Sequence, residues 1–129
     1  MIRISDAEYE VMKIVWKRKE TTSLEIIDDL KDYKWNFNTI RTLIKRLEDK
    51  GAIKVSGRRG KAYTYVATIE ENEYKREVSR DLLKKLYNNS IDEFILEHSK
   101  AGKITVKDIK NIIKYIDEKE KMKKDKDKK

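Results

Sequence analysis

The sequence predicts a mainly α fold with a small β wing in a chain of 129 residues. Three observations indicate this fold class. Proline is absent and only four glycines interrupt the chain, so long helical segments are left unbroken. Two capping-box patterns, at residues 5–8 and 22–25, mark helix starts near the N-terminus. After Gly51 the spacing of apolar residues changes from the helical period of about 3.6 to the strand period of 2.

The first two helices are predicted from their capping boxes. In each box, a Ser or Thr and a Glu three residues later satisfy each other's free backbone N–H groups. The apolar residues of the first helix cover more than one narrow stripe, so we expect burial on two sides. These residues are Ala7, Val11, Met12, Ile14, Val15 and Trp16. The expected inner face of the second helix consists of Leu24, Ile27 and Leu30, with Ile26 beside it.

The third helix combines an apolar inner face with a basic outer face. Asn36 is its expected N-cap, and Gly51 supplies the left-handed residue that ends it. The core positions, at i, i+3, i+4 and i+7, are Ile40, Leu43, Ile44 and Leu47. The outer face therefore carries Asn38, Arg41, Thr42 and Lys45, with Thr39 and Arg46 on its flank. No acidic residue occurs between Phe37 and Arg46, which favours a binding surface over a face that is only solvated.

Two β-rich runs after Gly51 predict a hairpin. Ile53 and Val55 alternate with a lysine, a glycine-bounded loop covers residues 56–60, and the second run covers residues 61–67. The cations at and just beyond the loop tip are Arg58, Arg59 and Lys61. Tyr63 and Tyr65 share one face of the second strand, and packing on the helices is favoured over base stacking for both.

The rest of the chain predicts three helices and no strand. They cover about residues 71–87 and 90–98, and a last helix begins at the capping pattern of residues 105–108. A segment this small seldom forms a stable core alone, so its apolar stripes are expected to meet a second copy of the chain. The expected contact residues are Leu82, Leu83, Leu86, Phe94, Ile95, Ile109, Ile112, Ile113 and Ile116.

The positive charge is concentrated in the third helix and the hairpin. The chain has 32 Lys and Arg against 24 Asp and Glu, a net charge of +8, and 43% of its residues are charged. Residues 34–61 hold nine basic and two acidic residues, a net +7, whereas residues 70–118 carry −1 and residues 119–129 carry +4. Such a basic segment favours a polyanionic partner, most often nucleic acid.

Residue types that are missing exclude several classes of protein. The absence of cysteine rules out disulfides, thiolate metal sites and cysteine nucleophiles, and fits a reducing, cytoplasmic setting. No apolar run exceeds three residues, so neither membrane insertion nor a signal peptide is expected. There is no phosphate-binding glycine loop, nucleophile elbow or histidine pair, so we expect no enzyme activity, no cofactor and no metal site.

Three helices followed by a two-stranded wing, with a basic third helix, describe the winged form of the helix-turn-helix. We therefore expect a winged-helix DNA-binding domain at residues 1–69 and a helical dimerisation domain at residues 70–118. Residues 119–129 are low in complexity and are expected to be a charged, disordered tail. The alternative is a winged-helix module that binds protein and has no specific DNA target, which predicts a mixed or apolar third helix.

The expected DNA contacts follow from the groove dimensions. The major groove admits one α-helix, so Arg41 can bond a guanine, Asn38 an adenine, and Thr42 a thymine methyl group. Lys45 and Arg46 lie further along and are expected to hold phosphates. The wing cations are expected to contact the flanking backbone or minor groove.

Several stretches of the chain resemble the BlaI/MecI/CopY family of bacterial transcriptional repressors. They are residues 4–12, the run WNFNTIRTLIKRL at residues 35–47, Lys50 with Gly51, and residues 63–65. The run from Thr39 to Leu47 is the most specific. The resemblance implies a homodimer that binds a palindromic operator through two winged domains. It also implies repression of genes for antibiotic resistance, such as β-lactamase, or for metal handling.

Two departures from the family pattern bear on how repression ends. Copper-responsive members use a cysteine cluster, which this chain lacks. In β-lactam-responsive members a membrane sensor metalloprotease cuts an Asn-Phe bond, and our alignment places that bond at Glu97-His98, where neither family residue occurs. The resemblance therefore implies such a protease as a partner without supplying its cleavage motif. His98, the only histidine, is expected to be a surface or packing residue.

Overall fold

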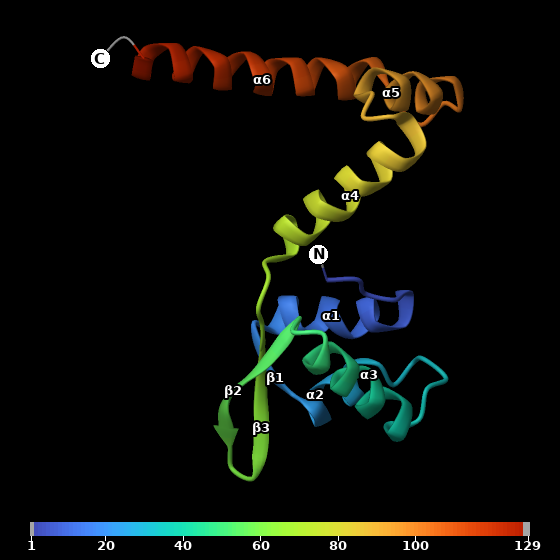
Figure 1. The fold of residues 1–129 in the computed structure, drawn as a ribbon, viewed down its shortest axis with the longest axis vertical. Coiled ribbons are helices and arrows are strands. Elements are labelled where there is room, and N and C mark those ends of the chain that lie inside the picture. The colour runs from blue at the N-terminus through green and yellow to red at the C-terminus, as the bar shows by residue number, and fades with distance from the viewer. Residues whose placement is uncertain (1, 128–129) are drawn as a thin grey trace. The chain divides into compact units, whose positions relative to one another are not determined.

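The computed structural model describes residues 2–127, and its order of elements confirms a mainly α fold with a small β wing (Figure 1). The helices are α1 (Asp6–Arg18), α2 (Ser23–Asp29), α3 (Phe37–Asp49), α4 (Glu71–Tyr87), α5 (Ile91–Lys100) and α6 (Val106–Asp127). The strands are β1 (Glu20–Thr22), β2 (Ile53–Arg59) and β3 (Ala62–Ala67). The chain divides into two compact units, Met1–Val78 and Ser79–Lys129, hereafter the N-terminal and C-terminal units.

Local hydrogen bonds explain where the helices begin. The backbone N–H of Glu8 donates to Ser5 Oγ over 3.2 Å, and the backbone N–H of Ser5 donates to Glu8 Oε2 over 3.4 Å. Thr22 and Glu25 make the same reciprocal pair at the start of α2. Asn36 caps α3 by accepting from the backbone N–H of Thr39 at 2.9 Å. These starts confirm the capping predictions.

The sheet has three antiparallel strands in the order β1-β3-β2, where the sequence predicted two. Strand β1 has only three residues and no apolar alternation, and its pairing of Glu20 with Val66 bridges a long stretch of chain. Strand β2 also continues to Arg59, through the segment predicted as a loop, with a register shift between Val55 and Gly57. The hairpin therefore turns at residues 60–61, where Gly60 has φ +66°.

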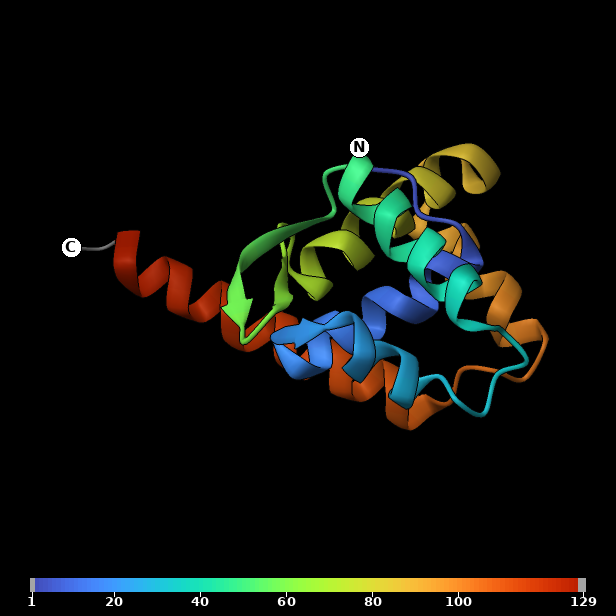
Figure 2. The same ribbon diagram turned by 90° about the horizontal axis from the view of Figure 1, so that it is seen from below.

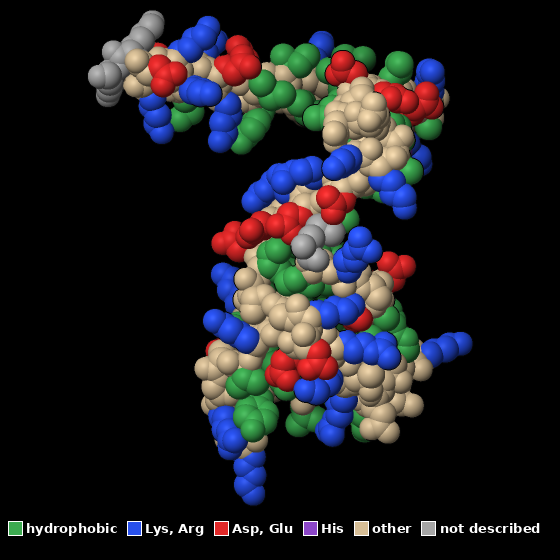
Figure 3. All heavy atoms as spheres, viewed as in Figure 1, with side chains coloured by type: hydrophobic (Ala, Val, Ile, Leu, Met, Phe, Trp, Pro, Cys, Tyr) green, Lys and Arg blue, Asp and Glu red, His purple; other side chains and the backbone are tan. Residues whose placement is uncertain are grey.

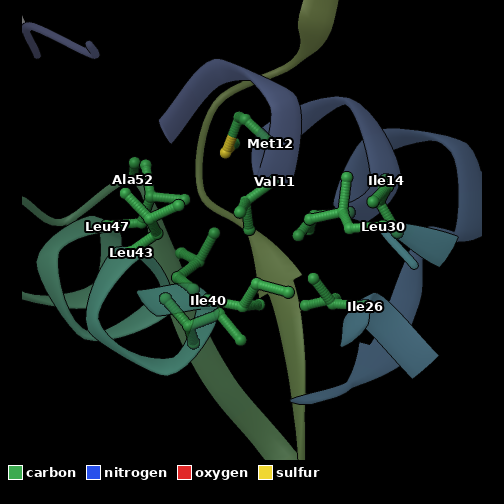
Figure 4. Close-up of a cluster of buried hydrophobic side chains, with 12 residues drawn as sticks. Val11, Met12, Ile14, Ile26, Leu30, Ile40, Leu43, Leu47 and Ala52 are labelled. Carbon is green, nitrogen blue, oxygen red and sulfur yellow. The ribbon is translucent and has the colours of Figure 1, made fainter. Parts of the chain in front are cut away.

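Side chains from the first three helices and from the start of β2 form one hydrophobic core (Figure 4). It contains Val11, Met12, Ile14, Val15, Ile26, Leu30, Ile40, Leu43, Ile44, Leu47, Ala52 and Ile53. The α3 core prediction is confirmed, because all four expected residues are buried. The α2 prediction is wrong in one position: Leu24 is 63% exposed and Ile26 is fully buried. In this short helix Ile26 and Leu30, four residues apart, form the inner stripe instead.

The first turns of α4 belong to the N-terminal unit, so the predicted boundary at residue 69 lies too early. Tyr74 is 8% exposed, and its ring centroid lies 5.6 Å from Trp16 and 6.1 Å from Tyr9. The indole N–H of Trp16 donates to the carbonyl of Ile69 at 2.9 Å. An aromatic contact and a hydrogen bond therefore attach this segment to α1, which apolar periodicity within α4 cannot reveal.

The C-terminal unit has no buried side chain among its described residues, 79–127. Helix α6 extends to Asp127, so residues 119–127 are helical and not the predicted disordered tail; residues 128–129 lie outside the described part. The helix starts at Thr105, which exchanges backbone-to-side-chain hydrogen bonds with Asp108. Once started, it continues through good helix formers such as Lys and Glu, aided by an ion pair between Lys121 and Asp117. Figure 3 shows many Lys side chains along it.

An ion pair between the buried Glu8 and the more exposed Lys50 connects α1 to the end of α3. Glu8 is 3% exposed, and its carboxylate accepts from Lys50 Nζ at 2.6 Å. Lys50 also donates to the carbonyl of Arg3 at 2.8 Å, which holds the N-terminal arm. Burial is the largest single influence on Glu8 and opposes ionisation, but hydrogen bonds from Lys50 and Ser5 together outweigh it and lower the pKa of Glu8 below its ordinary 4.5.

Replacing Lys50 with Met is expected to lower the free energy of unfolding by about 2–3 kcal/mol at neutral pH, because Glu8 then stays buried without its cation. Because the folded-state pKa of Glu8 is lowered, its ionised form stabilises the wild-type protein above pH 4.5, and this stabilisation is lost as the pH falls through the folded-state pKa. The free energies of unfolding of the two proteins should therefore converge in acid. Urea unfolding across pH measures this. Lys54→Met, at an exposed position of β2, is the control and should match wild type throughout. An equal loss in both variants would contradict the ion-pair explanation.

Candidate nucleic-acid interface

The six polar residues predicted on the outer face of α3 are all exposed. They are Asn38, Thr39, Arg41, Thr42, Lys45 and Arg46. Because the apolar stripe of α3 is fixed in the core, these side chains face away from the three-helix bundle. The hydroxyl of Thr39 is used by the N-cap, since it donates to Asn36 Oδ1 at 3.1 Å. The hydroxyl of Thr42 donates to the carbonyl of Asn38 at 2.8 Å.

A groove of about 390 Å³ separates α3 from the hairpin. Its α3 wall includes Arg41 and Lys45, and its hairpin wall includes Lys61, Tyr63 and Tyr65. The ribbons of α3 and of the hairpin can be followed in Figure 2, and Figure 3 shows Lys and Arg side chains at the end of the unit where the hairpin turns. The structure thus brings two of the predicted helix cations, Arg41 and Lys45, and the wing cation Lys61 to the walls of one groove.

The cations of this face differ in their partners. Arg41, Arg46 and Lys61 form no ion pair with any residue in the described part of the chain. Lys45 is paired within its own helix, 3.1 Å from Asp49 and 3.8 Å from Glu48, but its side chain remains 67% exposed. Exposed pairs of this kind are weak, so Lys45 can exchange its carboxylate for a phosphate at little cost.

The two wing arginines have different surroundings. The guanidinium of Arg58 lies 4.7 Å from the centroid of the Tyr63 ring and donates to its hydroxyl at 3.1 Å. Arg59 instead donates to Glu25 Oε1 at 2.7 Å, on helix α2. Tyr63 is 48% exposed and its ring contacts an arginine, so its predicted packing on the helices is wrong. Tyr65 does pack against the core.

The sequence interpretation missed Tyr63 and Glu25 as parts of this site. Arg58 pairs with Tyr63 across the hairpin, and a two-residue turn at residues 60–61 sets that register. Gly60, which marks the turn, was the sequence signal from which the pairing of Tyr63 with Arg58 could have been predicted. No local signal identifies Glu25, because it lies 34 residues from Arg59 in the sequence.

The predicted protease-sensitive bond lies inside α5. Glu97 pairs with Lys100 at 3.3 Å, and the half-buried ring of His98 lies 4.4 Å from Phe94. Cleavage between Glu97 and His98 would require the helix to open locally. Within residues 2–127 no cluster of His, Asp and Glu could hold a metal ion, and none of the helices there is long and apolar enough to cross a membrane.

Three helices, a wing and a basic outer face on the third helix define the N-terminal unit as a winged helix-turn-helix of the kind found in transcription regulators. Comparison with known proteins identifies the family. The family model described as penicillinase repressor matches residues 4–118, and the chain belongs to this family.

Individual relatives agree with this assignment. The chain is 31% identical to the penicillinase repressor of Bacillus licheniformis, over 95% of this chain and 96% of that protein. It is 32% identical to the methicillin resistance regulatory protein MecI of Staphylococcus aureus (strain N315), over 85% and 92% respectively. The solution structure of the DNA-binding domain of the repressor BlaI matches with 39% identity and a TM-score of 0.51, over 57% of this chain and 89% of that one. The predicted family is therefore confirmed.

Proposed function

We propose that this chain is a cytoplasmic transcriptional repressor that binds a palindromic double-stranded DNA operator as a homodimer. The observation that carries the proposal is the outer face of α3, where every exposed side chain from Asn38 to Arg46 is basic or neutral and polar. Membership of the penicillinase repressor family and the likeness to a BlaI DNA-binding domain support the same function. The names of the relatives favour resistance genes, such as one for a β-lactamase, as targets.

The proposed contacts divide into base readers and phosphate binders. Arg41 and Asn38 lie in the N-terminal half of α3, the part of a recognition helix that reaches base edges. Thr42, whose hydroxyl is already bonded within the helix, would offer its methyl group to a thymine. Lys45 and Arg46 lie further along the helix and would hold phosphates. Arg58 and Lys61 of the wing would contact the flanking backbone.

The homodimer is proposed from the C-terminal unit. Several of its large apolar residues are about half exposed or more: Leu82 49%, Leu86 59%, Ile112 49%, Ile113 60% and Ile116 48%. With no buried side chain among residues 79–127, these helices cannot supply the free energy that ordering them requires. A second copy would cover this surface. A membrane sensor metalloprotease acting at Glu97-His98 is proposed as a further partner on the family resemblance alone.

Arg41→Ala tests the proposed recognition helix. A bidentate contact to guanine contributes base discrimination, so we expect a loss of about 1–3 kcal/mol in binding and a relaxed preference at one base position. The probe is a duplex selected by the wild-type protein from a random-sequence pool, and anisotropy titrations against point variants of it give the preference. Arg58→Ala is the control and should weaken all sequences alike. Normal binding by the Arg41 variant would show that this face of α3 does not read DNA.

A further inference from the structure

Arg59 is fixed to the body of the N-terminal unit by carboxylates from two other elements. Its Nη1 lies 2.7 Å from Glu25 Oε1 on α2, and its Nη2 lies 3.8 Å from Glu20 Oε1 on β1. Glu20 also accepts from Ser56 Oγ of β2 at 3.0 Å. The wing strand β2 is therefore attached at two points to elements that precede the recognition helix.

Glu25 is itself held in place before it meets Arg59. Its Oε1 accepts from the backbone N–H of Thr22 at 3.1 Å, as the capping box requires, and its Oε2 lies 2.9 Å from Arg18 Nη1. Arg18 is in turn fixed by a two-point contact with Asp29, at 2.7 and 2.8 Å. The Thr22 N–H, and then Arg59 and Arg18, lower the pKa of Glu25 in spite of its desolvation, so it is ionised at neutral pH.

The neighbouring Arg58 provides the contrast. Its guanidinium lies on the Tyr63 ring and forms no ion pair with the described carboxylates, so its charge is available to a phosphate. Arg59 instead faces two carboxylates, those of Glu25 at 2.7 Å and Glu20 at 3.8 Å. A phosphate contact by Arg59 would have to break an ion pair anchored by a helix cap and leave two carboxylates facing DNA.

We propose that Arg59 is a positioning residue that holds the wing against α2, so that Arg58 and Lys61 meet the DNA backbone, and that Arg59 itself contacts no phosphate. This inference rests on the proposed function and revises the role expected of Arg59 from the sequence. It makes Glu25 a second positioning residue, one that caps α2 and aligns the wing with the same carboxylate.

Salt dependence separates the two roles of an arginine. A phosphate contact contributes to the slope of log affinity against log salt, about one unit for each contact, whereas a positioning residue does not. We expect Arg59→Ala to weaken binding to the selected duplex about 2- to 5-fold with the slope unchanged. Arg58→Ala, the matched control, should reduce the steepness of the slope. A reduced slope for Arg59→Ala would overturn the proposal.

The two possible roles of Arg59 predict opposite changes in DNA affinity for Glu25→Gln. Glutamine at this position preserves the capping box, so α2 stays formed. If Arg59 positions the wing, the variant should bind about 2- to 5-fold more weakly, and combining it with Arg59→Ala should cause no further loss. If Arg59 binds phosphate, removing the carboxylate should free it and strengthen binding, which would also overturn the proposal.

Amide hydrogen exchange on the free protein tests the attachment without DNA. Exchange in β2 and β3 should accelerate in Arg59→Ala and Glu25→Gln and remain unchanged in Lys61→Ala, which removes an exposed wing cation that makes no ion pair in the described part of the chain. Unchanged exchange in the first two variants would overturn the positioning role. Absence of DNA binding by the wild-type protein, with accelerated exchange in these variants, would instead reject the proposed function and leave the attachment of the wing intact.

Discussion

Raising the salt concentration from 50 to 200 mM is expected to weaken operator binding by about 10³- to 10⁵-fold. The cations assigned to phosphates are Lys45, Arg46, Arg58 and Lys61, which makes two sets of four in a homodimer, and about eight contacts correspond to a slope near −7. Each contact releases condensed counterions from DNA, and added salt opposes that release. Anisotropy titrations of the selected duplex at a series of salt concentrations measure the slope directly.

Variants of single cations test whether the slope arises at the proposed surface. Arg46→Ala should reduce its steepness by about two units for the dimer, one for each half-site. Lys17→Ala removes an exposed cation in the last turn of α1, outside the proposed surface, and should leave the slope unchanged. A wild-type affinity that does not respond to salt would rule out DNA as the partner of this basic face.

The features of the fold that could be predicted are those with local causes. The starts of α1 and α2 depend on a residue and its partner three positions later, so Ser5 and Thr22 are visible in the sequence as caps. Strand β1 depends on pairing with β3, more than 40 residues away, and three residues carry no periodicity of their own. The same distance explains why Tyr74 was placed in the wrong unit, since its aromatic partners lie in α1.

The candidate site divides in the same way. The outward orientation of Arg41 follows from the period of one helix and could be predicted, because the core stripe fixes the opposite face. The ion pairing of Arg59 could not be predicted, because charge counting treats every exposed arginine alike. Its acidic partner, Glu25, is on α2. A net charge of +7 over residues 34–61 therefore overstates the free charge of the interface: Arg59 and Lys50 are both engaged by carboxylates of the N-terminal helices.

Ile112→Glu is expected to convert the proposed homodimer to monomers and to weaken operator binding by about 10²- to 10⁴-fold. Ile112 is 49% exposed on α6, on the apolar stripe that also carries Ile109 and Ile116. A carboxylate buried there without a partner opposes association. Without the dimer, the second half-site contact no longer benefits from the effective concentration that linkage provides.

The control for Ile112→Glu introduces the same charge on α6 away from the apolar stripe. Asn111 lies one position away, about 100° around the helix from Ile112 and on its exposed polar side, so Asn111→Glu should remain dimeric in sedimentation experiments. Both tryptophans, Trp16 and Trp35, lie in the N-terminal unit, so tryptophan fluorescence reports whether that unit stays folded. Dimers of Ile112→Glu would place the interface elsewhere. Monomers that bind the full operator as tightly as wild type would separate dimerisation from DNA affinity and contradict the two-half-site mechanism.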